Sequence, residues 1–174
     1  MDETESLFGA DAMEFSKALT GEDDLAAIIR SHLYIEHELN VFLEGRIPEQ
    51  VFETIHIEYF DKIKLAVSLG FPSKYKAALK AVGTIRNKFA HNLRTQLTST
   101  MLDELYQVFD PVTKEGIQWG FKRINPHFPG RSKPKSHKEM PLRDRLSLYV
   151  VHIWAGLKAA NAEDRLSTNE SKVP

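Results

Sequence analysis

Residues 73–96, SKYKAALKAVGTIRNKFAHNLRTQ, decide the fold of this chain. Ser73 is a suitable N-cap, and apolar side chains then recur at the spacing of one helix face. These side chains are Tyr75, Leu79, Val82, Ile85, Phe89 and Leu93. The pattern predicts an amphipathic helix that packs centrally against the other elements. Gly83 interrupts it at a modest cost and would permit close approach of another backbone or of a ligand.

Further segments carry the same periodicity on both sides of this helix. We expect helices over about 22–44, 48–69, 98–109 and 142–165. Gly45, Gly70 and Pro111 are expected to end the first three of these, and Thr20 with Asp23 resembles a capping box before the first. The sequence shows no strand alternation and no internal repeat. The expected fold is therefore all-α, a helical bundle of about five main helices.

The 174 residues, 42% hydrophobic and 27% charged, are enough for one domain with its own core. We expect an acidic, partly helical segment over 1–20, a single domain over 20–165 and a disordered tail over 166–174. Residues 111–141 combine prolines and glycines with basic side chains and lack helical periodicity. They predict a long basic loop before the last helix.

Charge is distributed unevenly along the chain. Residues 1–24 hold eight Asp or Glu against one Lys, and residues 112–145 hold nine Lys or Arg against three acidic residues. Such asymmetry is compatible with a polyanionic partner. The simpler interpretation, slightly favoured by charge alone, is that the two ends screen each other.

Composition excludes several function classes. Without cysteine there is no disulfide, no thiolate zinc site and no cysteine nucleophile. An acidic start and the lack of a long apolar run predict a soluble, cytoplasmic protein with no membrane segment. Phosphate-binding and hydrolase glycine motifs are missing, and His32, Glu36 and His56 lack convincing metal-ligand spacing. We therefore expect no metal and no cofactor.

A polar face is predicted within the central helix. Asn87 and His91 are four residues apart and share this face, with Arg94 three residues further on. Arg86 lies about 140° around the axis from His91, in line with the apolar stripe. The two side chains therefore do not share a face of a straight helix.

Arg86 should be partly buried beside the core, where a guanidinium needs a carboxylate partner. Glu36 is the first candidate for this partner and Asp61 is the second. For an arbitrary Arg and His at this spacing, the simplest interpretation is structural. Arg86 would then form a buried ion pair, and His91 would be a cation favoured by the helix C-terminus.

Two stretches stand out in order along the chain, residues 60–71, FDKIKLAVSLGF, and residues 85–91, IRNKFAH. Together they resemble the mannitol operon repressor family. By resemblance that family belongs to the HEPN superfamily, whose motif is an Arg, a polar residue and a His after four to six intervening residues. The resemblance covers residues 20–110 in order and spacing, and is strongest over the two quoted stretches. It implies a HEPN-like helical bundle.

The resemblance also implies a metal-independent endoribonuclease site where two protomers of a homodimer meet. Arg86 would bind the scissile phosphate, and His91 would act as acid and base in attack by the ribose 2′-hydroxyl. Asn87 would orient His91 or contact the phosphate. A groove between two protomers could receive Arg86 and His91 from opposite sides. Many toxin-type members carry a Tyr two residues after the His, where this chain has Leu93.

Basic positions after the motif and in the expected loop are candidate RNA-binding residues. They are Arg94, Lys122, Arg123, Arg131, Lys133 and Lys135. Trp119, Phe121 and Phe128 could stack single-stranded bases there, or could anchor a solvated loop to the bundle. Direct DNA reading is not expected, because no helix-turn-helix pair with a basic recognition helix is found.

Three functions remain open. The first is an RNA-cleaving or RNA-binding HEPN-type protein in stress, defence or toxin-like control. The second is a non-catalytic transcriptional regulator of the mannitol operon repressor type, which works through protein–protein contacts. The third is a structural partner, such as an antitoxin-like subunit, in which the same helix forms an interface.

Overall fold

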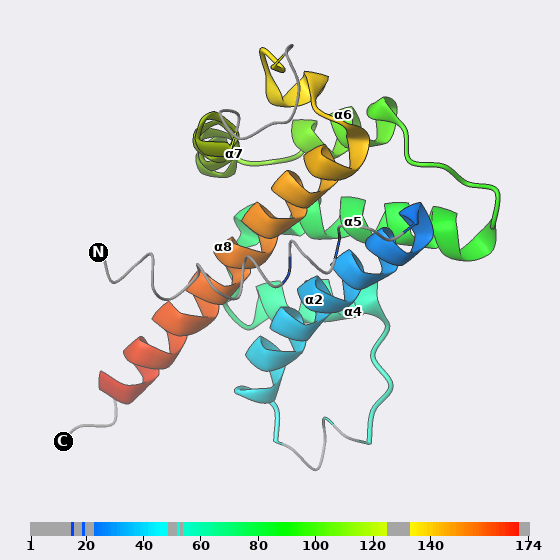
Figure 1. Ribbon diagram of the computed structural model, residues 1–174. Helices are drawn as coiled ribbons and strands as arrows, with labels where there is room; N and C mark the ends of the chain where they lie inside the picture. The colour runs from blue at the N-terminus through cyan, green and yellow to red at the C-terminus, as the bar shows by residue number, and fades with distance from the viewer. Residues whose placement is uncertain are drawn as a thin grey trace.

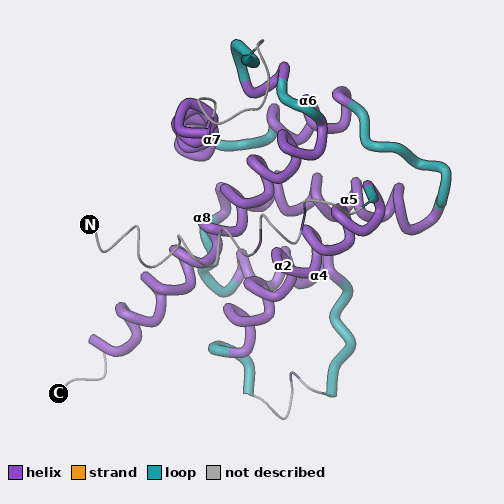
Figure 2. The backbone as a smooth tube through the Cα atoms, viewed as in Figure 1, coloured by secondary structure: helices purple, strands orange, loops and turns teal. Residues whose placement is uncertain are grey.

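Helix α5 (Lys76–His91) is the helix expected from residues 73–96. The structure is a computed structural model that describes residues 15, 19, 23–48, 52, 54–124 and 133–170 (Figure 1). The other elements are α2 (Asp24–Glu44), α4 (Tyr59–Ser68), α6 (Ser99–Gln107), α7 (Pro111–Ile124) and α8 (Leu142–Glu170), with short 3₁₀ helices η1 (Ser73–Tyr75) and η3 (His137–Glu139). No strand occurs in the described residues (Figure 2), so the predicted all-α fold is confirmed.

Helix α2 is the centre of the packing. It contacts α8, α5 and α4, while α6 bridges α5 and α8 and α7 packs against α8. Figure 1 shows α8 crossing the molecule diagonally, with α4 and α5 on one side of it and α7 near its beginning. In the part of the chain that the structure describes, no helix is long and apolar enough to cross a membrane.

The apolar stripe of α5 is buried as predicted, with one exception. Tyr75, Leu79, Val82, Ile85 and Phe89 all lie in the core. The exception is Leu93, whose side chain is 88% exposed, so its assignment to the stripe was wrong.

Helix α5 ends earlier than expected, and this explains the exposure of Leu93. Asn92 is extended, with φ −147° and ψ 105°, and its Oδ1 accepts a hydrogen bond from the backbone N–H of Arg94 at 3.0 Å. Such a local side-chain bond competes with helix continuation. Arg94 therefore lies in a turn, and the predicted helical face does not extend beyond His91.

The helix expected over 48–69 is shorter in the structure. It begins at Tyr59, and residues 54–58 are not helical. Thr54, Ile55 and Ile57 are β-branched, and such side chains lose rotamer freedom in a helix. The irregular segment that results forms one wall of the pocket described below. Gly70 lies just after the end of α4, as predicted, and has a φ of +102°, which glycine adopts readily.

The prediction of a long loop over 111–141 is wrong for its first half, which forms α7. Asp110 Oδ1 accepts from the N–H groups of Val112 and Thr113 at 3.0 and 3.2 Å. Asp110 is thus an N-cap and Pro111 takes the first helical position, where its missing N–H costs nothing. Pro111 therefore begins α7 rather than closing α6. Residues 125–132, with Phe128 and Arg131, lie outside the described residues.

The glycines of α7 are packing positions, although the sequence suggested a loop. A Cβ at Gly120 would lie 2.6 Å from Cε1 of His152 on α8, and one at Gly116 would lie 3.3 Å from Cδ2 of the same ring. The His152 Nδ1–H donates to the carbonyl of Leu148 at 2.7 Å. Two glycines four residues apart therefore let α7 approach α8 closely.

The remaining boundaries differ by a few residues. Asp23 caps α2 by accepting from the Ala26 N–H at 2.7 Å, and Thr98 caps α6 by accepting from the Met101 N–H at 3.3 Å. Thr20 lies outside the described residues, as does most of the acidic segment 1–20. Helix α8 continues to Glu170, so it runs past the boundary expected at residue 165.

A buried polar network ties α6, η3 and α8 together. Arg145 is 1% exposed, and its guanidinium donates to the Tyr149 hydroxyl oxygen at 2.8 Å and to Asp103 Oδ1 at 2.5 Å. The Tyr149 hydroxyl lies 2.6 Å from His137 Nδ1. Burial, followed by the charge of Arg145, lowers the pKa of His137. A neutral His137 can accept a hydrogen bond from the Tyr149 hydroxyl. Arg145 is then the one cation of the network.

Candidate functional site

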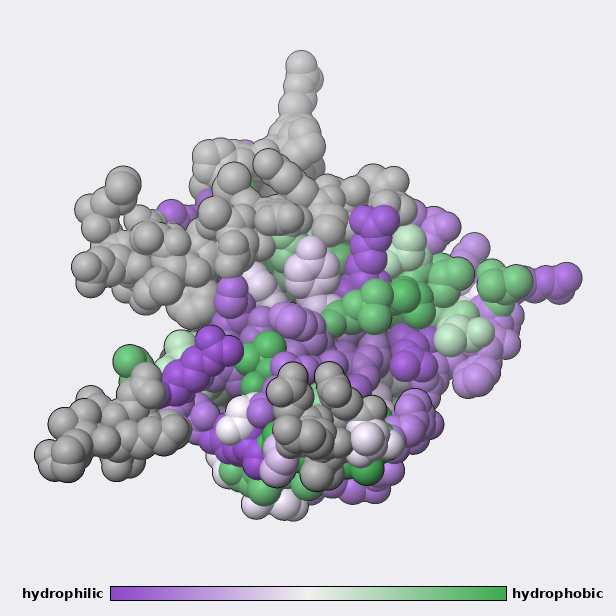
Figure 3. Space-filling view, turned by 90° about the horizontal axis from the view of Figure 1, so that it is seen from below, coloured by the Kyte–Doolittle hydropathy of each residue, from purple (hydrophilic) through white to green (hydrophobic). Residues whose placement is uncertain are grey.

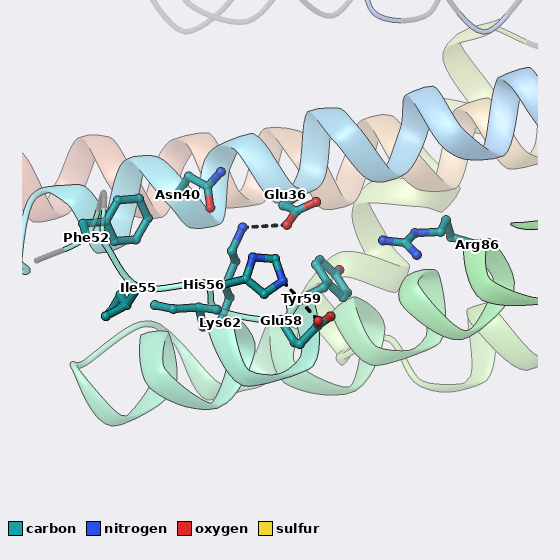
Figure 4. Close-up of a pocket in the computed structure, with 10 residues that line it drawn as sticks. Glu36, Asn40, Phe52, Ile55, His56, Glu58, Tyr59, Lys62 and Arg86 are labelled. Carbon is teal, nitrogen blue, oxygen red and sulfur yellow. Dashed lines mark hydrogen bonds and ion pairs between the residues drawn. The ribbon is translucent and has the colours of Figure 1, made fainter.

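A pocket of about 310 Å³ opens between α2, α4, α5 and the irregular segment before α4 (Figure 4). This volume is near the lower end of the range for small-ligand sites, roughly 300–1,000 Å³. Phe52, Ile55 and Tyr59 form its apolar wall. The polar side chains that line it are Glu36, Asn40, His56, Glu58, Lys62 and Arg86.

Arg86 connects the sequence motif to this pocket. It is half-buried, as predicted, and one of its Nη atoms donates to Asn87 Oδ1 at 2.8 Å. In Figure 4 its guanidinium points from α5 toward the pocket. The motif Arg therefore faces a cavity within its own chain.

The hydrogen-bond partner of Arg86 is Asn87, and neither of the two carboxylates that the sequence suggested takes this place. Glu36 Oε1 accepts from Lys62 Nζ at 2.7 Å, and Asp61 Oδ1 accepts from Lys64 Nζ at 2.7 Å. Among the described residues, no hydrogen bond or ion pair joins Arg86 to either carboxylate. Lys62 lies in the first turn of α4, which packs against α2, and it takes Glu36 as its partner. Arg86 therefore keeps donors for a ligand.

His32 lies beside this cluster and is 2% exposed. Its Nδ1 is 3.5 Å from Glu36 Oε2, and its ring lies 4.2 Å from that of Tyr59. Burial, and next the positive charge of Arg86, lower the pKa of His32 to about 4, against an opposing effect of Glu36. His32 is therefore neutral at pH 7, and its buried Nε2 has no hydrogen-bond partner among the described residues.

Tyr59 is the first residue of α4, and its side chain packs against α5. Its hydroxyl donates to the Leu79 carbonyl at 3.0 Å, and burial raises its pKa, so the proton stays on. A Cβ at Gly83 would lie 2.6 Å from Tyr59 Cε1. Gly83 therefore permits a close approach, as expected, but the neighbour is an aromatic ring rather than a backbone.

Replacing Gly83 with alanine should destabilise the protein. Alanine is preferred over glycine in a helix by about 1 kcal/mol, but overpacking against a fixed ring costs about 1–3 kcal/mol. We expect a net loss of roughly 1 kcal/mol in the free energy of unfolding, measured by urea denaturation. Gly45→Ala is the matched control, because its Cβ would meet nothing closer than 3.6 Å. Equal stability of the two variants would contradict the packing argument.

The other motif residues lie at the end of α5. Asn87 is half-buried, whereas His91 and Arg94 are exposed. The structure brings Arg86 and Asn87 into contact, and shows no hydrogen bond or ion pair between His91 and either of them in the described residues. Arg86 and His91 of one chain thus point to different places, as the helical spacing indicated.

The candidate RNA-binding residues are dispersed. Lys122 and Arg123 are exposed on α7, where Arg123 lies 5.2 Å from the ring of the exposed Trp119. Lys133 and Lys135 are exposed just before η3. Figure 1 places the end of α5 and helix α7 on opposite sides of the molecule. The turn that carries Arg94, just after α5, and the basic residues of α7 therefore lie on opposite sides of the molecule.

Sequence reasoning missed most of the pocket. Asn40, Glu58 and Lys62 had no assigned role, and His56 was considered only as a possible metal ligand. Within the described residues, no group of three or more His, Cys, Asp or Glu could hold a metal ion. The spacing of Glu36 and Asn40 on one helix face was the available signal, since both side chains point to the pocket in Figure 4.

The surface around the site is mixed in character. Viewed from below, apolar patches lie between hydrophilic residues on the described surface (Figure 3). Large exposed apolar side chains on or near the site's elements include Leu33, Ile55 and Leu93.

Comparisons with protein-family models, with curated proteins and with solved structures find no match for this chain. The resemblance of residues 60–71 and 85–91 to HEPN-type proteins therefore stays a prediction. The chemistry of the site follows from its own geometry.

Proposed function

We propose that this protein is a homodimeric, HEPN-type RNA-binding protein that cleaves RNA without a metal ion, of the kind used in stress, defence or toxin-like control. The observation that carries the proposal is the state of Arg86. Its guanidinium is half-buried, is oriented by Asn87, makes no ion pair with a described carboxylate and faces a pocket. A guanidinium so placed is suited to bind a phosphate group through paired N–H donors.

Cleavage would proceed by transfer within the RNA strand. His91 takes the proton of a ribose 2′-hydroxyl, the 2′-oxygen attacks the adjacent phosphorus, and the bond to the 5′-oxygen breaks. The protonated His91 then gives its proton to the leaving 5′-oxygen, which restores the neutral imidazole, and a 2′,3′-cyclic phosphate remains. Arg86 stabilises the charge that develops on the phosphate. An imidazole suits the proton transfers because its charge changes near neutral pH.

A second protomer would bring these groups together. Within one chain Arg86 faces the pocket and His91 is exposed at the helix end, so one phosphate requires a contribution from another copy. Leu93, two residues after His91, is 88% exposed and would be covered in such a dimer.

A second candidate function is a non-catalytic regulator that acts through protein contacts. It is supported by the exposure of Leu93 and of Trp119, which is 61% exposed on α7. Large exposed apolar side chains are typical of interaction surfaces. In this function Arg86 and His91 would contribute to an interface without chemistry.

One experiment tests the proposal against the second candidate. Purified protein is incubated with single-stranded RNA in EDTA, together with Arg86→Ala and the matched control Lys88→Ala, which removes one exposed positive charge from the same helix. We expect cleavage by the wild type and the control and its loss in Arg86→Ala. If the folded wild-type dimer leaves RNA intact, the enzyme proposal is wrong and the regulator is favoured.

A further inference from the structure

We infer that the outward face of α7 pairs with the same face of a second copy of this chain, with the two helices antiparallel. The inference goes beyond the proposed function and does not depend on it, because α7 and the end of α5 lie on opposite sides of the molecule. It follows from the order of apolar, acidic and basic side chains along one face of α7.

Helix α7 has a buried face and an exposed face. Its buried residues are Ile117, Gly120 and Phe121. Figure 1 shows the helix at the edge of the molecule, viewed almost along its axis. Val112 and Trp119 are 66% and 61% exposed, and their spacing of seven residues places them within about 20° of each other around the helix. Two turns of α7 thus present an apolar stripe to solvent.

One acidic and one basic side chain follow this stripe. Glu115 and Lys122 are exposed, are also seven residues apart and lie on the same flank of Trp119. They are separated by about 10 Å along the axis, beyond the spacing of three or four residues at which helix side chains pair. Neither forms an ion pair within the described part of the chain. The flank therefore offers one negative and one positive charge to a partner.

An antiparallel copy of α7 matches both charges. When a two-fold axis crosses the helix pair midway between residues 115 and 122, Glu115 of each copy lies opposite Lys122 of the other. The axis then passes beside Trp119, so the two exposed indole rings are covered together. In a parallel pair the same flank of the two copies lies on opposite sides, and the two charges do not meet. The charge order thus selects the antiparallel arrangement.

The same charge order favours a second copy over a nucleic acid. Lys122, Arg123 and Trp119 alone would suit an RNA strand, since basic side chains contact phosphates and an indole stacks on bases. Glu115 lies on the same face and repels a phosphate backbone, and Val112 offers no ring to a base. Opposite charges at a spacing of seven residues complement a second copy of themselves instead. One helix pair makes a small interface, so we expect micromolar association.

The first measurement is sedimentation velocity of the full chain over a series of concentrations up to the high micromolar range. We expect the mean mass to rise with concentration, and to pass that of a dimer if the contact proposed at the end of α5 also forms. Trp119→Ala should weaken the α7 contact by about tenfold or more, since a Trp at the centre of an interface commonly dominates its affinity. Trp119 is exposed, so thermal melting of this variant should be unchanged.

The decisive experiment reverses the two charges. Glu115→Lys and Lys122→Glu each place like charges opposite each other at both ends of the contact, and each should weaken association by about tenfold or more. An equal mixture of the two variants puts opposite charges together again and should associate as the wild type does. The double variant, Glu115→Lys with Lys122→Glu, should do the same. Glu104→Lys is the matched control, because Glu104 is exposed on α6 outside this face.

The outcomes separate this inference from the proposed function. Association that each reversal weakens and the mixture restores supports the antiparallel contact, whether or not RNA is cleaved. A wild-type chain that stays monomeric, or a mixture that associates no better than its components, overturns it. A dimer that all the α7 variants leave unchanged overturns the α7 contact and leaves the dimer at α5 in place. If Trp119→Ala lowers RNA affinity without changing the mass, this face binds RNA and the inference is wrong.

Discussion

Replacing His91 with alanine is expected to slow RNA cleavage by about 10²–10⁴-fold, the usual contribution of a positioned acid–base group. The reason is that His91 is the side chain of the motif that can both accept and donate a proton, whereas Arg86 and Asn87 act through hydrogen bonds. His91 is exposed at the end of α5, so its removal should leave the fold intact. The measurement is the single-turnover rate of cleavage in EDTA, with thermal melting as the check on folding.

His37→Ala is the matched control for this variant. His37 is an exposed histidine on α2 that does not line the pocket, and its loss should leave the rate unchanged. A His91→Ala protein that cleaves RNA at the wild-type rate would show that the acid–base group lies elsewhere. Mixing inactive Arg86→Ala with inactive His91→Ala should restore part of the activity if each site combines residues from two protomers.

Acidification from pH 7 to pH 4 is expected to remove about 3 kcal/mol of stability through His32 alone. The folded protein holds the pKa of His32 at about 4, below the ordinary value of 6.5. The unfolded chain therefore binds more protons between these values. The contribution is fully present above pH 6.5 and is lost progressively as the pH falls toward 4. The physical cause is burial first, and then the charge of Arg86.

His137 and His152 act in the same direction, because burial lowers the pKa of each. Urea denaturation at a series of pH values between 7 and 4 measures the total loss. His32→Leu should flatten this dependence, whereas His37→Leu should leave it unchanged since His37 is exposed. A slope that is the same in His32→Leu and wild type would show that His32 does not titrate on unfolding.

Helix content was readily predictable because it depends on local patterns. The buried stripe of α5 from Tyr75 to Phe89 follows from spacing alone, and so does the half-burial of Arg86. Errors arose where one residue has two meanings. A proline such as Pro111 can either end one helix or begin the next. The N-cap formed by Asp110 makes Pro111 the beginning of α7. Gly116 and Gly120 suggest a loop until the ring of His152 is placed against them.

The candidate site was predictable in part. Arg86, Asn87 and His91 follow from the sequence motif, and the separation of Arg86 from His91 follows from helix geometry. The partner of Arg86 did not follow, because Glu36 could pair with any nearby cation. The packing of α4 against α2 decided the matter by bringing Lys62 to Glu36.

The sequence by itself determined that this protein is helical, which faces of its helices are apolar, and where its Arg-to-His motif lies, because these properties depend on residues a few positions apart. Tertiary structure alone decided that Arg86 faces a pocket and that His32 beside it is buried and neutral at pH 7. These properties depend on how α2, α4 and α5 pack, and that packing joins side chains far apart in the chain. The motif thus gains a cavity that residue spacing could not supply.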